Sequence, residues 1–322
     1  GDYPMEIDSQ RFGQIDSDNS DDIADLTVEE RTVGEFNIWT TSDSTFGEFE
    51  DEEDVLNAAE NGTIQQDDTI TNGDYVVHEL QATGLEGLVD VGVDNQSAAP
   101  FNETGNLLSI ISSEEREGID LRIRQTAATT DPNANRKVAN ISAMAAAGDI
   151  SVINGDGAYY IAFDSNDVVI EGSREAETGD AYDVRLRIKD QRALNPNPDD
   201  VEDSDDFSEF YDVATTSFSL EEVEGELTTP IEVEAAEGQS ITGTTNAAPG
   251  NTIGVRVRSA DGVTPGFVLS QSSIEVQPDG TFTADELDFS DASAGDNFTV
   301  TTRNAPFEQA EADGTVVESA DG

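Results

Sequence analysis

The sequence predicts an all-β protein, and two patterns lead to that prediction. Apolar and polar residues alternate with a period of two over short runs, which is the pattern of a half-buried antiparallel strand. The clearest runs are residues 119–124, 182–188 and 252–258. Gly, Asp and Asn separate such runs, as at residues 278–280. Many short strands with turn signals between them predict sandwiches or barrels.

Helical periodicity is scarce and predicts only two short helices. Residues 53–59 have acidic residues in the expected first turn, and Asn61 and Gly62 follow as an end signal. Residues 140–147 predict the second helix. Helices are therefore minor elements beside the strands.

The predicted strands group into domains that acidic or Pro-rich segments separate. Residues 1–27 are acidic and rich in Ser, Asp and Asn, so we expect a linker or the end of a preceding module, with at most a weak strand at residues 3–7. Residues 28–226 predict a larger β-sandwich domain with acidic loop insertions, the longest at 195–206. Residues 228–318 hold about seven short strands, the size of one immunoglobulin-like sandwich. The predicted fold class is therefore all-β, with tandem immunoglobulin-like β-sandwich domains joined by acidic linkers.

The net charge of the chain indicates the salt concentration at which the protein folds. Acidic residues number 70 against 15 basic ones, which gives a net charge of −55. Such a charge opposes compaction by self-repulsion in dilute buffer. In about 1 M salt the Debye length falls to about 3 Å, and repulsion between distant charges largely disappears. The sequence therefore predicts a protein that folds in brine, and its only lysines are Lys137 and Lys189, so arginine supplies most of its positive charge.

Disorder is the alternative that such acidity also allows. The charges, however, are interleaved with well-patterned strands and with 14 Phe and 6 Tyr, which disordered chains lack. A strongly negative surface excludes nucleic acid and anionic membranes as partners. The sequence shows neither a signal peptide nor a membrane-spanning run. Because the chain begins at Gly1 rather than Met, we expect an excerpt or a processed product whose export signal and anchor lie elsewhere.

Enzymatic sites are poorly represented, and we expect no enzyme. The chain has no Cys and a single histidine, His78, so a zinc site lacks its usual ligands. A Ser–His–Asp site would depend on this one imidazole, and no Gly-x-Ser-x-Gly motif accompanies it. Alternation instead places His78 on the face of Val76 and Leu80, as a packed or edge residue. A carboxylate-pair glycosidase stays open only because acids are abundant.

Asn-x-Ser/Thr triplets are candidates for N-glycosylation. They are Asn61, Asn95, Asn102, Asn140 and Asn297. A chain rich in Asn, Ser and Thr yields such triplets by chance, so their context ranks them. Asn61, Asn95 and Asn102 lie in polar, turn-like surroundings from which a glycan could project. Asn140 falls on a predicted helix, and Asn297 enters a strand in which we expect Phe298 to face inward, so an unmodified side chain is favoured at both.

Acidic clusters are candidates for binding divalent cations, because Ca²⁺ takes six to eight oxygen ligands. One cluster consists of Asp199, Asp200, Asp203, Asp205 and Asp206, and a second lies within residues 50–54. Neither follows the spacing of an EF-hand loop. With 70 acids in the chain such neighbours arise by chance, so a solvated surface is the main alternative.

Turn and strand motifs recur along the chain in a pattern that one protein family shares. Those of the predicted C-terminal domain are GQSITGTTN (238–246), APGNTIGVRVRS (248–259), VQPDGTFTA (276–284), DFS (288–290) and GDNFTV (295–300). Those of the larger domain are LQATGLEG (80–87), GAYYIAFD (157–164) and GDAYDVRLR (179–187). Through these motifs the chain resembles the haloarchaeal major cell-surface (S-layer) glycoproteins over roughly nine tenths of its length.

The resemblance implies a secreted, N-glycosylated structural subunit of a coat at the surface of a halophilic archaeon. It also implies that copies of the chain are partners of one another, with Ca²⁺ or other cations at their interfaces. We therefore expect assembly through salt- and cation-screened contacts between acidic β-sandwich domains. A one-dimensional extracellular filament is the first alternative. A surface adhesin or carbohydrate-binding module is the second, for which Trp39 would be the platform, although a core position in a sandwich strand is favoured for this residue.

Overall fold

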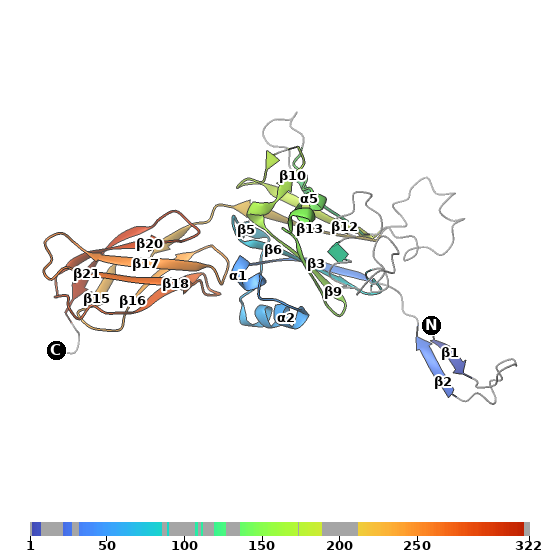
Figure 1. Cartoon of the computed structure of the whole chain (residues 1–322), viewed down its shortest axis with the longest axis horizontal. Helices are drawn as coiled ribbons and strands as arrows, with labels where there is room; N and C mark the ends of the chain where they lie inside the picture. Colours follow the sequence, from blue (N-terminus) through green and yellow to red (C-terminus); the bar gives the residue numbers. More distant parts are fainter. Residues whose placement is uncertain are drawn as a thin grey trace.

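The computed structural model describes residues 2–7, 22–27, 32–85, 89, 107–108, 111, 119–126, 136–172, 174–188 and 212–318. Strands dominate these residues, and the all-β, sandwich-type prediction is confirmed. Buried hydrophobic side chains gather in two large clusters, one from residues 36–220 and one from residues 227–316. We call the corresponding parts the central unit (residues 33–221) and the C-terminal unit (residues 225–317). Figure 1 shows the two units lying end to end.

Two sheets of the central unit enclose its main core between them. The five-stranded sheet has the order β4-β3-β6-β9-β8, with β3 (Val33–Thr41), β4 (Gln65–Gln66), β6 (Tyr75–Ala82), β8 (Ser151–Asn154) and β9 (Ala158–Asp164). The four-stranded sheet has the order β5-β13-β12-β7, with β5 (Thr69–Thr71), β7 (Ile119–Gln125), β12 (Ala181–Ile188) and β13 (Asp212–Glu221). A further short pair joins β10 (Val169–Ile170) to β11 (Arg174–Glu175).

Strand β12 shows how period-two alternation builds the sandwich. Its apolar side chains Tyr182, Val184 and Leu186 are buried in the main core. The alternate positions, Asp183 and Arg185 among them, face outward and are partly or fully exposed. The same alternation places β7 and β17 as the sequence predicts, so all three predicted runs are strands.

The single histidine lies inside the main core, as predicted. His78 is 0% exposed, and its Nδ1 lies 3.2 Å from the carbonyl oxygen of Ile161. Its ring is surrounded by those of Phe163, Phe36 and Phe218, with centroids 5.2, 5.9 and 5.9 Å away. Burial among these rings lowers the pKa of His78 from 6.5 to about 4, because the charged imidazole loses its water.

Both predicted helices are present. They are α2 (Glu52–Asn61) and α5 (Ile141–Ala147), and the structure adds the short α1 (Asp43–Phe46) and the 3-10 turn η1 (Ser165–Asp167). Asp51 caps α2 by accepting from the amides of Glu53 and Asp54 at 3.0 and 3.3 Å. Gly62 ends α2 in a left-handed conformation with φ +80°.

Helices α1 and α2 cover the outer face of the five-stranded sheet (Figure 1). Phe46 of α1 and Val55 of α2 belong to a third buried cluster, together with Val77 and Tyr160 of the sheet. Trp39 packs against this cluster while staying partly exposed, and its indole nitrogen donates to Glu79 Oε2 at 2.8 Å. The central unit thus has three layers: helices, a five-stranded sheet and a four-stranded sheet.

The C-terminal unit is a two-sheet sandwich with its own aromatic core. One sheet has the order β14-β16-β19, with β14 (Gly225–Leu227), β16 (Gln239–Thr245) and β19 (Thr281–Leu287). The other has the order β15-β21-β20-β17-β18, with β15 (Ile231–Glu234), β17 (Thr252–Ser259), β18 (Val268–Glu275), β20 (Asn297–Arg303) and β21 (Glu311–Val317). Phe282, Phe289 and Phe298 fill the space between them. The immunoglobulin-like connectivity stays a prediction.

The N-terminal segment contains one more strand than the sequence predicts. Strands β1 (Asp2–Ile7) and β2 (Asp22–Thr27) pair with each other in antiparallel fashion. The prediction of at most one weak strand in residues 1–27 was therefore wrong, because the Asp residues of β2 disfavour strands and its pairing partner supplies what propensity does not. No helix in the part of the chain that the structure describes is long and apolar enough to cross a membrane.

The burial of His78 predicts a loss of stability on acidification. The unfolded chain takes up a proton near pH 6.5, whereas the folded chain does so only near pH 4, so stability is lost as the pH falls through this window. A shift of this size corresponds to about 3 kcal/mol. We expect His78→Leu to lack this component, and chemical unfolding of both proteins in molar salt between pH 7 and 4 measures the difference. Carboxylates titrate alike in both proteins and cancel, so equal pH dependence would contradict a buried neutral histidine.

Candidate functional site at the joint between the two units

The two units meet where a turn of the C-terminal unit docks on the central unit. The turn, residues 246–251, connects β16 to β17, and its Ala247 and Ala248 are each only 3% exposed. The sequence predicts a turn here, and the bond from Asn251 N to Ala248 O (3.3 Å) confirms it. Figure 1 shows this end of the C-terminal unit lying beside α1 and β5.

The centre of the joint is the carboxylate of Asp74, which follows β5 and is 3% exposed. Its Oδ2 accepts from Ala248 N at 2.8 Å, and its Oδ1 accepts from Asn251 Nδ2 at 2.6 Å. The Thr71 hydroxyl donates to Oδ2 from within the central unit. Burial raises the pKa of Asp74 above its usual range, while these donors oppose that shift and the nearby Asp164 carboxylate adds to it. One buried side chain therefore holds two donors of the neighbouring unit.

A second set of contacts brings the two backbones into close approach. Gly250 has φ +86°, and a Cβ there would overlap the hydroxyl of Thr45 at the end of α1. The Ser44 hydroxyl donates to the Gly250 carbonyl at 3.3 Å. On the other side, the Gln65 side-chain amide donates to the carbonyl of Pro278. Only a residue without a side chain fits at position 250, because both the space and the backbone conformation exclude a Cβ.

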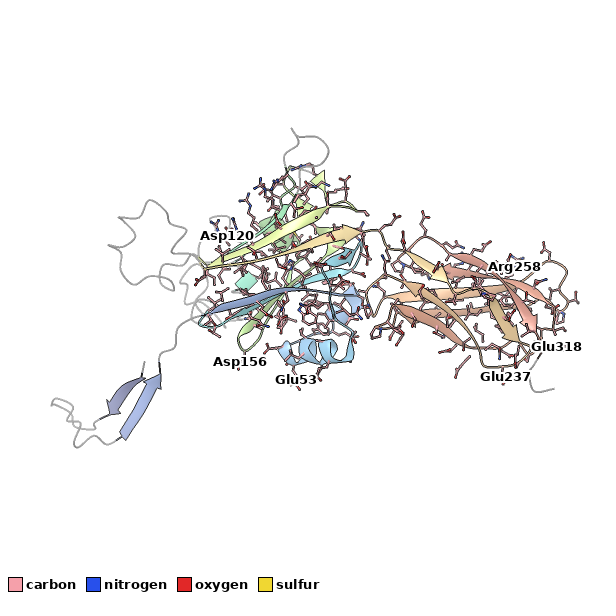
Figure 2. The ribbon with its side chains drawn as sticks, turned by 180° about the vertical axis from the view of Figure 1, so that it is seen from behind. Glu53, Asp120, Asp156, Glu237, Arg258 and Glu318 are labelled. Carbon is pink, nitrogen blue, oxygen red and sulfur yellow. The ribbon has the colours of Figure 1, made fainter. Side chains whose placement is uncertain are left out.

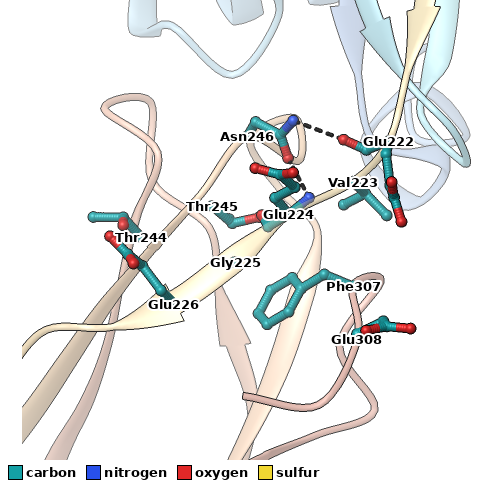
Figure 3. A pocket seen from close by; sticks show the side chains of 10 residues that line it. All are labelled: Glu222, Val223, Glu224, Gly225, Glu226, Thr244, Thr245, Asn246, Phe307 and Glu308. Atoms are coloured by element: carbon teal, nitrogen blue, oxygen red, sulfur yellow. Dashed lines mark hydrogen bonds between the residues drawn. The ribbon is translucent and has the colours of Figure 1, made fainter. Parts of the chain in front are cut away.

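The link between the units is itself fixed to the C-terminal unit, as Figure 3 shows. Asn246 Nδ2 donates to Glu221 Oε1 at 2.9 Å and to the Glu222 carbonyl at 3.0 Å. Asn246 Oδ1 accepts from the amide of Glu224 at 2.7 Å. The side chain of Asn246 thus satisfies backbone groups of the link that would otherwise form hydrogen bonds with water.

A hollow of about 510 Å³ lies beside this link. Phe307 lines it, and a Cβ on Gly225 would overlap the Phe307 ring. Its charged side chains are all acidic, namely Glu222, Glu224, Glu226 and Glu308. The described lining of the hollow therefore repels anions. The contacts across the joint hold one sandwich against the other.

The predicted glycosylation sites have different surroundings. Asn61 is exposed at the end of α2, and its Oδ1 accepts from the Thr63 amide at 2.9 Å. Asn297 is exposed at the start of β20, and its Oδ1 accepts from the Thr315 hydroxyl at 3.1 Å. Asn140 is partly buried and caps α5 by accepting from the Ala143 amide at 3.0 Å. Asn95 and Asn102 lie outside the described residues.

Of the two predicted cation clusters, the structure describes only the second, at residues 50–54. Asp199, Asp200, Asp203, Asp205 and Asp206 lie outside the described residues. In the second cluster, Asp51 caps α2, and Asp54 Oδ2 accepts from the Glu50 amide at 2.8 Å. Among the described residues, no group of three or more His, Cys, Asp or Glu side chains is placed to hold a metal ion. The candidate Ca²⁺ site at 199–206 stays a prediction.

The sequence did not point to Asp74 as the centre of a joint. Nothing local distinguishes it from the other acids, and its partners lie in the next unit, beyond residue 245. The pair of alanines at 247–248 was the one available signal, because apolar residues in an otherwise polar turn indicate that the turn is covered.

We expect Asp74→Asn to loosen the joint. An amide nitrogen in place of Oδ1 or Oδ2 would face a donor of the turn, which costs about 1–3 kcal/mol for an unsatisfied buried group. Small-angle X-ray scattering in molar salt should show a wider distribution of particle dimensions, and a protease should cleave near residues 222–224 faster. Gly250→Ala should do the same without any change in charge.

The matched control for the joint is Asp261→Asn, which removes the same charge from an exposed position of the C-terminal unit. Scattering and cleavage of this variant should equal those of the unaltered chain. If Asp74→Asn and Gly250→Ala also behave like the unaltered chain, the joint does not set the orientation of the units.

Comparisons with known proteins show which proteins the chain is similar to. No protein-family model matches the chain. "Cell surface glycoprotein" of Haloferax gibbonsii is 31% identical over 332 residues, which cover 99% of this chain and 34% of that protein. "Cell surface glycoprotein 1" of Haloarcula hispanica is 29% identical over 330 residues, again 99% of this chain and 34% of that protein. "Cell surface glycoprotein 2" of the same species is 28% identical over 315 residues, 94% of this chain and 32% of that protein.

The chain thus spans about a third of the length of the curated relatives it matches. The similarity extends over both units and over the joint between them, because the alignments cover nearly the whole chain. It agrees with the acidic composition and the β-sandwich architecture. Over nearly its whole length the chain is therefore similar to a segment of haloarchaeal cell surface glycoproteins, and its location is extracellular, at the cell surface.

Proposed function

We propose that the chain is a structural segment of an S-layer, in which copies assemble through salt- and cation-screened contacts between acidic β-sandwich faces. Its role at the surface is structural. The observation that supports this proposal is the joint: Asp74, Gly250 and Asn246 fix two sandwiches in one orientation. A coat with a fixed spacing needs subunits whose units keep one orientation, because motion at a joint would change the distance between the contact surfaces of a subunit.

The outward strand positions explain why such contacts need salt. In the C-terminal unit Glu232, Glu311 and Asp313 are exposed on β15 and β21. Figure 2 shows acidic side chains projecting from both units, among them Glu53, Asp156 and Glu237. Two such surfaces repel each other at low ionic strength, whereas in about 1 M salt the repulsion acts only over about 3 Å.

We also propose N-linked glycans at exposed asparagines. Asn61 and Asn297 project from the ends of secondary-structure elements, where an added sugar meets water. Glycans at such positions would keep the coat surface hydrated and limit contacts to the faces without them.

A filament is the alternative, and the end-to-end arrangement of the units favours it (Figure 1). Electron micrographs of the native material separate the two arrangements directly. A two-dimensional array supports the coat, and isolated threads support the filament.

We expect the native assembly to dissociate when salt is removed. Dialysis from molar salt to about 0.1 M raises the Debye length to about 10 Å, so that acidic faces repel across the contact. Sedimentation and electron microscopy then follow release of subunits. Addition of a chelator at constant molar salt shows separately whether divalent cations are required. An assembly that stays intact in low salt with chelator would contradict screened contacts.

Glycopeptide mass spectrometry of the native protein tests the glycosylation proposal. We expect glycans on the peptides that contain Asn61 and Asn297. At Asn297 the sequence alone favours an unmodified side chain, and the exposure of this asparagine in the structure is the reason for proposing a glycan there. Asn140 provides the internal comparison, because its amide caps α5 and is partly buried, so its peptide should be unmodified. Unmodified Asn61 and Asn297 in material from native cells would refute the assignment of these two sites.

A further inference from the structure

The outer face of the four-stranded sheet is basic, although the chain as a whole is acidic. Arg122 and Arg124 of β7 and Arg185 of β12 occupy outward positions there, because their neighbours Ile123, Val184 and Leu186 point into the core. They line a hollow of about 630 Å³ together with Arg136 and the hydroxyl-bearing strand β13. We call Arg122, Arg124, Arg136 and Arg185 the arginine face.

The arginine face departs sharply from the average charge of the molecule. Four of the 15 basic residues of the chain line this one hollow, and Asp183 is the only acidic residue among the described residues that line it. These described lining residues carry a net charge of +3, in a chain with a net charge of −55. Such a concentration of positive charge attracts a negative partner.

Strand pairing sets two of these arginines against each other. In the register of β7 and β12, Arg185 lies directly opposite Arg122. Side chains at such positions have Cβ atoms about 5 Å apart, and like charges there are destabilising. In the neighbouring pair Arg187 lies opposite Asp120 and binds it with an N–O distance of 3.1 Å. The Arg122–Arg185 pair instead places two positive charges opposite each other on the outer face of the sheet.

The Arg122 side chain has a hydrogen-bond donor that no described residue uses. Its Nε is buried and has no hydrogen-bond partner among the described residues. A guanidinium presents its donors in a planar fork that fits a carboxylate with two hydrogen bonds. Thr215 of β13 lies opposite Arg185 and adds a neutral hydroxyl-bearing side chain to the lining of the hollow.

We propose that the arginine face is the docking surface for a second copy of this chain, which inserts carboxylates of an outward acidic strand. The proposal rests on the self-assembly put forward above and changes one detail of it, because one of the two faces in this contact is the arginine face rather than a second acidic face. Salt is still needed, since the remaining surfaces of both copies are acidic and repel each other. Outward strand positions are spaced about 7 Å apart, and β21 shows exposed Glu311 and Asp313 at that spacing. Arg122 and Arg124 have the same spacing on β7, so one acidic strand can pair with both.

The charge of the face limits the symmetry of the contact. Two arginine faces repel each other, so they do not meet on a twofold axis, and the arginine face of one copy meets a different, acidic face of the next. A head-to-tail contact of this kind leaves one face of each type available at the ends and propagates into rings or open arrays, whereas a reciprocal pair of such contacts closes a twofold dimer.

Paired double variants of the whole chain test this contact. Arg122→Gln with Arg185→Gln removes two positive charges from the arginine face. Arg256→Gln with Arg258→Gln removes the same charge from exposed positions of β17 in the C-terminal unit. Sedimentation equilibrium in molar salt measures self-association. We expect the first variant to associate more than about tenfold more weakly than the unaltered chain, and the control within about twofold.

The outcomes separate this inference from the proposed function. If the unaltered chain associates and the arginine-face variant associates equally well, the arginine face is not the contact, while self-assembly stands. If both double variants weaken association equally, the effect is one of net charge and the inference is overturned. If the unaltered chain stays monomeric at every concentration in molar salt, self-assembly fails and the inference with it. Thermal unfolding monitored by circular dichroism shows that each variant is folded.

A cross-link identifies the occupant. Arg122→Lys keeps the charge and supplies an amine that a carbodiimide joins directly to a touching carboxylate. A mixture of ¹⁴N- and ¹⁵N-labelled chains distinguishes links between copies from links within one chain. We expect mixed-isotope cross-links between position 122 and a carboxylate of another copy. Links confined to one chain, or to an acidic sugar, would overturn the proposal.

Discussion

The structure is governed by the excess of acidic over basic side chains. With a net charge of −55, the chain can fold only if strands place their charges on the outside and salt screens them there. Period-two alternation does the first, and rings such as Phe163 and Phe282 fill the spaces that result. Charges that are buried nevertheless have partners: Asp120 binds Arg187 at 3.1 Å, and Asp180 binds Lys137 at 2.7 Å.

The joint shows how the protein connects two cores without enlarging the apolar surface between them. Asp74 accepts hydrogen bonds from a backbone amide and a side-chain amide of the next unit, so the connection consists of short, buried and directional contacts. Salt screens exposed ion pairs strongly but acts little on a buried hydrogen bond. A joint of this kind keeps its geometry at the ionic strength that the rest of the surface requires, which suits a structural protein at the cell surface.

The few positive charges of this acidic molecule are distributed unevenly over its surface. An arginine face on the central unit and acidic strands on the C-terminal unit give the chain two unlike surfaces. Where every copy is uniformly acidic, salt permits contact but selects no orientation. A local positive face selects one, because only there does the approach of a carboxylate gain hydrogen bonds as well as lose repulsion.

Features that depend on neighbouring residues could be predicted from the sequence alone. Alternation at 182–188 identified β12 and its buried face, the acids and Gly62 delimited α2, and the face shared with Val76 buried His78, because these signals repeat within a few residues. Strand β2 was missed because its own residues disfavour a strand and only pairing with β1 stabilises it. Tertiary structure alone decided that the turn at 246–251 meets Asp74 and that Arg122 lies opposite Arg185. These contacts join residues far apart in the chain. They could not be predicted from the sequence, because packing over whole sheets selects strand register and docking, and a short run of residues does not contain that information.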